Sequence, residues 1–331
     1  MDLSTRYLGL TLRNPLVASA SPLTRELGNL RRLEDLGVGA VVMPSIFEEQ
    51  IEHEGELIEN LVTIGRDGYA EALSYFPTSA SYAVGPGRYL DVLRRAAASL
   101  EIPVIASLNG VTNRGWIGYA REIEDAGAHA LELNVYFVPA DPALAGRDVE
   151  RRYLDILRAV KEAVKIPVAV KLNPYFSSIG HMALELDRAG ADGLVLFNRF
   201  YQPDINLARL AVQPDLELSS AREIRLPLLW IGVLAGRVKA SLGASTGVES
   251  ADEVVKYLLA GADVAMTTSA LLRHGLDHAK VLLDGLVEWL HVRDLDTLER
   301  VRGRMSLANV EDKEAFERAN YIKILQGYRV G

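Results

Sequence analysis

Polar residues that could hold a small molecule stand at the ends of short apolar segments along this chain. The segments have the length and apolar character of buried strands, and each ends in hydroxyl, amide or ammonium side chains. These residues are Ser19, Ser21, Ser45, Ser107, Asn109, Asn134, Lys171, Asn173, Asn198, Ser245, Thr246, Thr267 and Thr268. If the segments form one parallel sheet, their carboxyl ends make a ring that suits a flat heterocycle. Polar residues also end strands in ordinary loops, so a purely structural explanation stays open.

One lysine stands within such a segment. Side chains alternate along a strand, which puts Glu132 and Asn134 on one face, and Ala169 and Lys171 on one face of the next segment. We therefore expect Lys171 to point inward. It either forms a structural ion pair with Glu132 or is a cation held for catalysis. In an alternative enzyme class, an aldolase or lyase, Lys171 would form a Schiff base.

The last two predicted strands carry a possible phosphate site. Thr246 and Gly247 precede a segment whose Ser250 is a good helix N-cap, and Thr268 and Ser269 follow the final strand. In barrels of parallel strands, the loops at these positions commonly bind phosphate through backbone N–H groups and a helix N-terminus.

A repeated phrase indicates the architecture. Glycine, a short apolar run and a polar end recur at 37–45, 126–134, 189–198 and 260–268, and four further strands are predicted at 15–21, 102–110, 166–174 and 238–246. Amphipathic helices between them favour parallel pairing. We predict a single-domain (β/α)₈ TIM barrel over 1–331, with an open doubly wound sheet as the alternative. Long loops after strands two and six, 46–101 and 199–237, are candidate lids. The tail from about 278 is predicted to be mostly helix that closes the bottom of the barrel or packs on a partner.

Composition excludes several classes of function. A net charge of −8 disfavours nucleic acid as a partner, and no apolar run is long enough to cross a membrane. The absence of cysteine excludes thiolate metal ligands and thiol catalysis, and no metal site is predicted. The amino terminus has no secretory pattern, so we expect a cytoplasmic protein with a small-molecule substrate.

The chain resembles the dihydroorotate dehydrogenase family of FMN enzymes from about residue 5 to 275. The matching stretches are RYLGLTLRNPLVASAS, AGAHALELN, PVAVKLNPYF, AGADGLVLFN and TGVESADEVVKYLLAGADV, of which VKLNPYF is the most specific. The resemblance implies a flavin oxidoreductase acting on CH–CH donors in pyrimidine biosynthesis, and a homodimer. The absence of a GxGxxG motif after the first strand favours FMN over FAD.

The resemblance also implies roles for individual residues. Lys171, Asn134 and Tyr136 are the expected catalytic residues, and Lys171 would neutralise negative charge on the reduced flavin ring. Asn109, Asn198 and Tyr75 would bind substrate. The residues expected to bind FMN are Ser19, Ala20, Ser21, Ser45, Ser107, Asn134, Lys171, Asn198, Thr246, Gly247, Thr268 and Ser269.

The substrate side departs from the family pattern. Phe137 stands where the family has a Cys or Ser base, and 43–45 reads Met-Pro-Ser in place of a lysine motif. The segment 74–77, Ser-Tyr-Phe-Pro, replaces an Asn-containing loop. Tyr136 or Tyr75 could act as acid or base, or each could be a packed aromatic. The substrate could therefore be another dihydro-heterocycle or an enone. A tRNA dihydrouridine synthase fits less well, given the acidic balance and the missing cysteine, and a non-catalytic flavin protein stays open.

Overall fold

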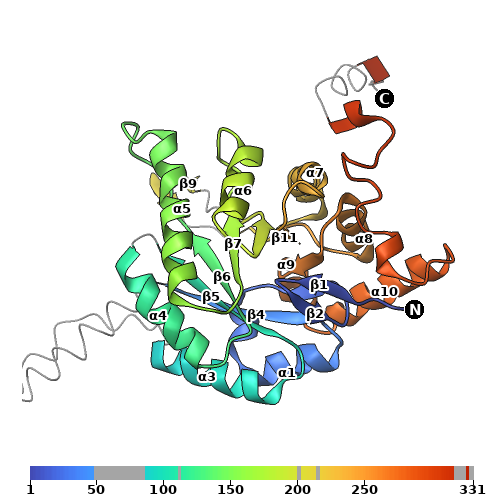
Figure 1. Ribbon diagram of the computed structural model, residues 1–331, viewed down its shortest axis with the longest axis horizontal. Helices are drawn as coiled ribbons and strands as arrows, with labels where there is room; N and C mark the ends of the chain where they lie inside the picture. Colours follow the sequence, from blue (N-terminus) through green and yellow to red (C-terminus); the bar gives the residue numbers. More distant parts are fainter. Residues whose placement is uncertain (48–85, 111–112, 200–202, 214–216, 317–325, 328–331) are drawn as a thin grey trace, which may run out of the picture.

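The computed structural model describes residues 1–47, 86–110, 113–199, 203–213, 217–316 and 326–327. Eight parallel strands close into a barrel in the order β11-β12-β3-β4-β5-β6-β7-β8, with helices outside it (Figure 1). The predicted (β/α)₈ barrel is confirmed. The strands are β3 Leu16–Ala18, β4 Ala40–Phe47, β5 Val104–Gly110, β6 Ala130–Val135, β7 Val168–Leu172, β8 Gly193–Leu196, β11 Ser241–Ser245 and β12 Val264–Thr267.

Helices alternate with these strands. They are α1 Leu27–Asp35, α3 Pro86–Ser99, α4 Asn113–Asp125, α5 Gly146–Ala163, α6 Ile179–Arg188, α7 Arg225–Leu234, α8 Ala251–Ala260, α9 Ser269–His274 and α10 His278–His291, with 3₁₀ turns η1 Pro22–Arg25, η3 Ala221–Ile224, η4 Leu298–Arg300 and η5 Lys313–Phe316. One large apolar cluster fills the space between strands and helices. None of the helices in the described part of the chain is long and apolar enough to cross a bilayer.

An N-terminal hairpin closes the bottom of the barrel. β1 (Thr5–Tyr7) pairs with β2 (Leu10–Leu12), and Tyr7, Leu8 and Leu12 pack with the inward-facing apolar side chains of the barrel strands. The Leu8 N–H donates to Ser241 Oγ at the first residue of β11. The hairpin, and not the tail, therefore fills this end of the barrel; α10 is the helix predicted for the start of the tail, and packing of the tail on a partner stays a prediction. α10 packs on α8, and the residues after it form turns that bond to the outside of α7 and α8.

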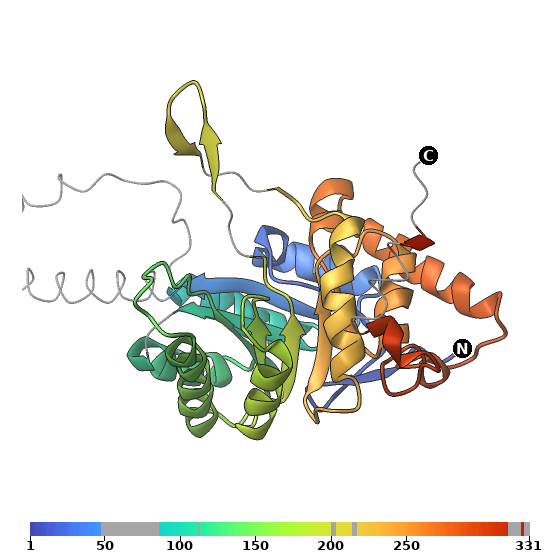
Figure 2. The same cartoon turned by 90° about the horizontal axis from the view of Figure 1, so that it is seen from above.

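The two intervals predicted to be long loops, 46–101 and 199–237, contain helices and, in the second, a hairpin. After β8, the chain forms a hairpin of β9 (Asp204–Asn206) and β10 (Ala211–Gln213), which projects away from the barrel (Figure 2), and then α7. α7 is almost entirely apolar and contains Pro227, so it lacks the polar face by which an amphipathic helix is recognised. In the first interval, α3 is an ordinary barrel helix, and 48–85 lies outside the described residues.

Candidate functional site

The inward-facing strand residues meet at the C-terminal mouth of the barrel, as their alternation predicts. Strand register pairs Asn109 with Asn134, and Asn134 with Lys171, so the three residues are neighbours on one face. All three are buried. Such a row of amide and ammonium groups can exist without water only if a bound molecule or neighbouring side chains satisfy it.

Lys171 is held between two other strands. Its Nζ lies 3.3 Å from Glu132 Oε1 on β6 and 3.4 Å from Ser19 Oγ, just after β3. Glu132 is 1% exposed, and its second oxygen, Oε2, has no hydrogen-bond partner among the described residues. The ion pair that the sequence left as one of two alternatives is therefore present, and it fixes a cation in the barrel mouth.

Two further side-chain pairs order the ring. Asn198 Nδ2 donates to Asn134 Oδ1 over 2.7 Å, and the hydroxyls of Ser45 and Ser107 lie 2.7 Å apart. The Tyr89 hydroxyl accepts from the Ser107 N–H at 3.0 Å, and burial raises the pKa of this phenol, which keeps it neutral. These pairs limit the rotamers of the ring before any ligand binds.

A cavity of about 280 Å³ extends from Lys171 to the ends of β11 and β12. It brings together nine of the residues expected to bind FMN: Ser19, Ala20, Ser21, Lys171, Asn198, Thr246, Gly247, Thr268 and Ser269. Ser45, Ser107, Asn134, Asn109 and Tyr136 do not line it, and Tyr75 lies outside the described residues.

The corner of this cavity where the sequence predicts phosphate binding, called the phosphate corner below, is built from unusual backbone. Thr246 has φ +82° and Gly247 has φ +75°, both in the left-handed region that favours glycine. A Cβ on Gly247 would lie 2.9 Å from the Ser220 carbonyl oxygen and 3.0 Å from the Ile224 nitrogen. On α8, the Tyr257 hydroxyl donates to the Thr246 carbonyl at 2.7 Å and holds the loop from below.

Ser219 belongs to this corner, although the sequence analysis missed it. Its Oγ accepts from the Gly247 N–H at 3.3 Å and donates to Ser269 Oγ at 2.9 Å. The signal that could have found it is the capping box of Ser220 and Glu223, which begins a helix directly after Ser219. Nearby, the Thr268 hydroxyl is buried without a hydrogen-bond partner among the described residues.

Asn173 does not join the ring, contrary to expectation. Its Nδ2 donates to the Tyr153 hydroxyl at 2.7 Å, and its Oδ1 accepts from the Tyr175 N–H at 2.7 Å. Tyr153 in turn donates to the Val135 carbonyl at 2.8 Å. Through Tyr153, Asn173 therefore connects the end of β7 to α5 and to the end of β6.

Comparison with known proteins decides the family. The dihydroorotate dehydrogenase family model matches residues 2–290. The chain belongs to the dihydroorotate dehydrogenase family. It is thus an oxidoreductase of the dihydroorotate dehydrogenase type that acts on a small molecule.

Two of the three relatives of this dihydroorotate dehydrogenase family member named here match it over nearly its whole length. A protein of Aeropyrum pernix named as a candidate dihydroorotate dehydrogenase A (fumarate) is 28% identical over 320 residues, which is 91% of this chain and 97% of its own. The dihydroorotate dehydrogenase B (NAD(+)) catalytic subunit of Methanocaldococcus jannaschii is 27% identical over 313 residues, with 91% and 97% covered. The corresponding subunit of Methanocella arvoryzae is 31% identical over 198 residues, with 60% and 62% covered.

At the position where this dihydroorotate dehydrogenase family member departs from the family pattern, Phe137 packs against a helix. The Arg152 guanidinium of α5 lies 3.9 Å from the centre of the Phe137 ring, a cation–π distance. Phe137 follows β6 by two residues, and it does not line the cavity beside Lys171.

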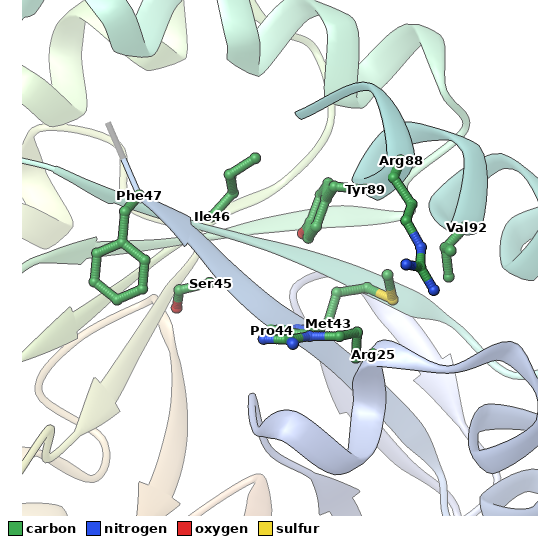
Figure 3. Close-up of a pocket in the computed structure, with 9 residues that line it drawn as sticks. All are labelled: Arg25, Met43, Pro44, Ser45, Ile46, Phe47, Arg88, Tyr89 and Val92. Carbon is green, nitrogen blue, oxygen red and sulfur yellow. The ribbon is translucent and has the colours of Figure 1, made fainter. Parts of the chain in front are cut away.

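The Met-Pro-Ser segment of this family member bends β4. The register with β5 shifts between Val42 and Ser45, because Pro44 has no N–H for the ladder. A small cavity of about 70 Å³ lies at this bend (Figure 3). Figure 3 shows Ser45 and Phe47 on one side of β4, and Tyr89, Arg88 and Val92 on the other. Arg88 therefore does not extend the ring that contains Ser45.

Proposed function

We propose that this chain is an FMN-dependent oxidoreductase that transfers hydride between a dihydropyrimidine-like substrate and FMN. The observation that carries the proposal is the single cavity that contains both the buried Lys171 and the phosphate corner at Thr246 and Gly247. A flavin mononucleotide has an electron-accepting ring at one end and a phosphate at the other, so it needs both features at opposite ends of one cavity.

The residues present fit that group. Gly247 lets its loop lie close against the Ser220–Ile224 backbone, where a Cβ would be 2.9 Å from the Ser220 carbonyl oxygen, and the buried Thr268 hydroxyl lacks a partner of its own among the described residues. Arg273 Nη2 donates to the Ser219 carbonyl at 3.2 Å, which puts a guanidinium near the proposed phosphate position, although its Nη1 is paired with Glu249. Backbone N–H groups, hydroxyls and a nearby guanidinium are the usual partners of a phosphate.

The chemistry that FMN would supply when bound is reversible hydride acceptance from carbon. Lys171 would stabilise negative charge at the ring, because its ammonium is fixed by Glu132 and Ser19 and needs no reorientation. The Asn198–Asn134 pair would orient polar groups of the ring or substrate from the neighbouring strands. Asn109 is the remaining buried amide of the row and would bind substrate.

The substrate need not be dihydroorotate itself. Phe137 has no proton-accepting group, and Arg152 holds its ring, so oxidation of a substrate that must lose a proton there would be slow. Another dihydro-heterocycle or an enone is therefore a second candidate substrate for the same flavin chemistry.

The Schiff-base alternative is less favoured. Its lysine must be free to attack a carbonyl carbon, whereas Lys171 Nζ is already held 3.3 Å from Glu132 Oε1 and 3.4 Å from Ser19 Oγ.

One purification tests the proposal. The protein should be yellow, heat should release a cofactor that chromatographs as FMN, and anaerobic addition of candidate dihydro-heterocycles should bleach the flavin. Release of FAD, or a colourless protein that FMN does not bind, would contradict it. Borohydride trapping of a substrate adduct on Lys171 would support the aldolase instead.

A further inference from the structure

A second cavity, of about 340 Å³, opens beside the candidate flavin cavity. It shares Phe197, Asn198, Arg199 and Thr246 with that cavity and continues outward between the end of β7 and the start of α7. The residues found only in this second cavity are Pro174, Tyr175, Arg222, Glu223, Arg225, Leu226 and Pro227. None of them has a role in the proposed flavin chemistry.

The lining of this cavity is positively charged, whereas the chain as a whole is negatively charged. Its charged lining residues are three arginines and one glutamate, a sum of +2, whereas the whole chain has a net charge of −8. Glu223 Oε1 lies 3.0 Å from Arg199 Nε, so the one carboxylate is already paired. Arg222 and Arg225 have no ion-pair partner within the described ranges of the chain.

The two unpaired arginines are placed to act together. They are three residues apart in the continuous helical stretch formed by η3 and α7, so their side chains leave the same side of it. Two neighbouring guanidinium groups repel one another unless an anion lies between them, and their donors match phosphate oxygens in pairs.

The remaining lining of the cavity is apolar and aromatic. Tyr175 is 61% exposed, and the 2.7 Å bond from its N–H to Asn173 Oδ1 fixes the backbone that presents it. Pro174, Leu226 and Pro227 complete this part of the lining. An exposed aromatic ring beside arginines is a stacking surface for a planar base.

We propose that this cavity binds a nucleoside monophosphate, with its phosphate on Arg222 and Arg225 and its base on Tyr175. A phosphate monoester carries about −1.5 to −2 charges near neutral pH, which matches the +2 of the lining. The site is separate from the phosphate corner assigned to FMN, which lies at Gly247, Thr268 and Ser269. A nucleotide here would contact Asn198 and Arg199 from the outer side, and so could alter the flavin cavity.

Calorimetric titration of the FMN-loaded protein with AMP, in chloride buffer without phosphate, tests the proposal. One AMP should bind per chain, and inorganic phosphate should compete with it. Arg222→Ala and Arg225→Ala should each weaken binding by roughly tenfold, the effect expected for one charge-assisted contact. Arg237→Ala is the matched control, because it removes the same charge just beyond the other end of α7. It should leave AMP affinity unchanged.

The aromatic contact has its own test. Tyr175→Ala should weaken AMP by about tenfold and leave ribose 5-phosphate unaffected, whereas Tyr175→Phe should bind AMP normally. The proposal is overturned if millimolar AMP does not bind, if the Arg222 and Arg225 variants equal the Arg237 variant, or if ribose 5-phosphate binds as well as AMP. It is also overturned if AMP binds only after FMN is removed, since the ligand would then occupy the flavin corner. A protein without flavin would refute the proposed function alone, because the same variants still decide where AMP binds.

Discussion

Lys171 Nζ and Glu132 Oε1 lie 3.3 Å apart in the mouth of the barrel, with the lysine side chain 9% exposed and the glutamate side chain 1% exposed. Lys171 is the only cation within ion-pair distance of Glu132 among the described residues. Removing it would leave a buried carboxylate unpaired, a change that typically costs about 3–5 kcal/mol. A slow Lys171 variant could therefore reflect either lost catalysis or a damaged barrel.

A double substitution separates these two effects. We expect Lys171→Met to lower the free energy of unfolding and to slow flavin reduction by roughly a hundredfold, the size expected for one preorganised electrostatic contact. Adding Glu132→Gln should restore much of the stability, because no charge is then buried, while reduction stays slow. Stopped-flow absorbance and denaturant unfolding measure the two quantities. If the double variant regains the normal rate, Lys171 has only a structural role.

Gly247 provides a second prediction, on flavin binding. Gly247→Ala should reduce FMN affinity by at least tenfold, because the new methyl group would be 2.9 Å from the Ser220 carbonyl oxygen and would push the loop out of shape. Gly236→Ala is the control: Gly236 has φ +76°, yet nothing lies within 4 Å of its Cβ position. It should show the same backbone strain, about 1 kcal/mol, with normal FMN affinity. Equal FMN affinities of the two variants, measured by fluorescence quenching, would contradict the assignment.

The sequence predicted the eight strands because each has a local signal: a glycine or proline before it, an apolar run, and a polar end. It predicted the inward direction of Lys171 for the same reason, since alternation along a strand is a local rule. α7 was hidden because a helix that is apolar on all sides has no periodic pattern.

Contacts between distant segments could not be predicted in this way. The N-terminal hairpin at the bottom of the barrel depends on the hydrogen bond from the Leu8 N–H to Ser241, 233 residues away. The predicted phosphate corner depends on the hydrogen bond between Ser219 and Ser269. The placement of Asn173 was wrong because Tyr153, on a helix, competes for the amide that the strand end offers. Only the closed barrel determines which of several possible partners a polar strand end meets.

Tyr153 should make stability depend on pH in alkaline solution. Burial is the main cause that raises the pKa of this phenol from 10.0 to about 12. A group with a raised folded-state pKa contributes its stability fully below pH 10 and loses it as pH rises from 10 to 12. Two pKa units correspond to roughly 2–3 kcal/mol.

We therefore expect Tyr153→Phe to be less stable than the wild type at pH 8, since Asn173 and the Val135 carbonyl lose a partner. Between pH 10 and 12 the difference should shrink, because phenylalanine does not ionise. Urea unfolding across this pH range measures it. A difference that stays constant would show that the Tyr153 phenol does not titrate in this window.

The last prediction concerns proton removal from the substrate. Wild-type oxidation of dihydroorotate should be slow or absent, because Phe137 cannot accept a proton and Arg152 holds its ring against α5. Phe137→Cys should bring no gain, since the stacking of Phe137 directs this position toward Arg152, and the residue does not line the cavity beside Lys171. Arg152→Ala removes the contact that holds this position against α5, so we expect the Arg152→Ala/Phe137→Cys variant to show a modest gain. Anaerobic flavin reduction by dihydroorotate measures each rate. Rapid wild-type reduction with a pH profile that disappears in Tyr136→Phe would refute this reasoning and make Tyr136 the base.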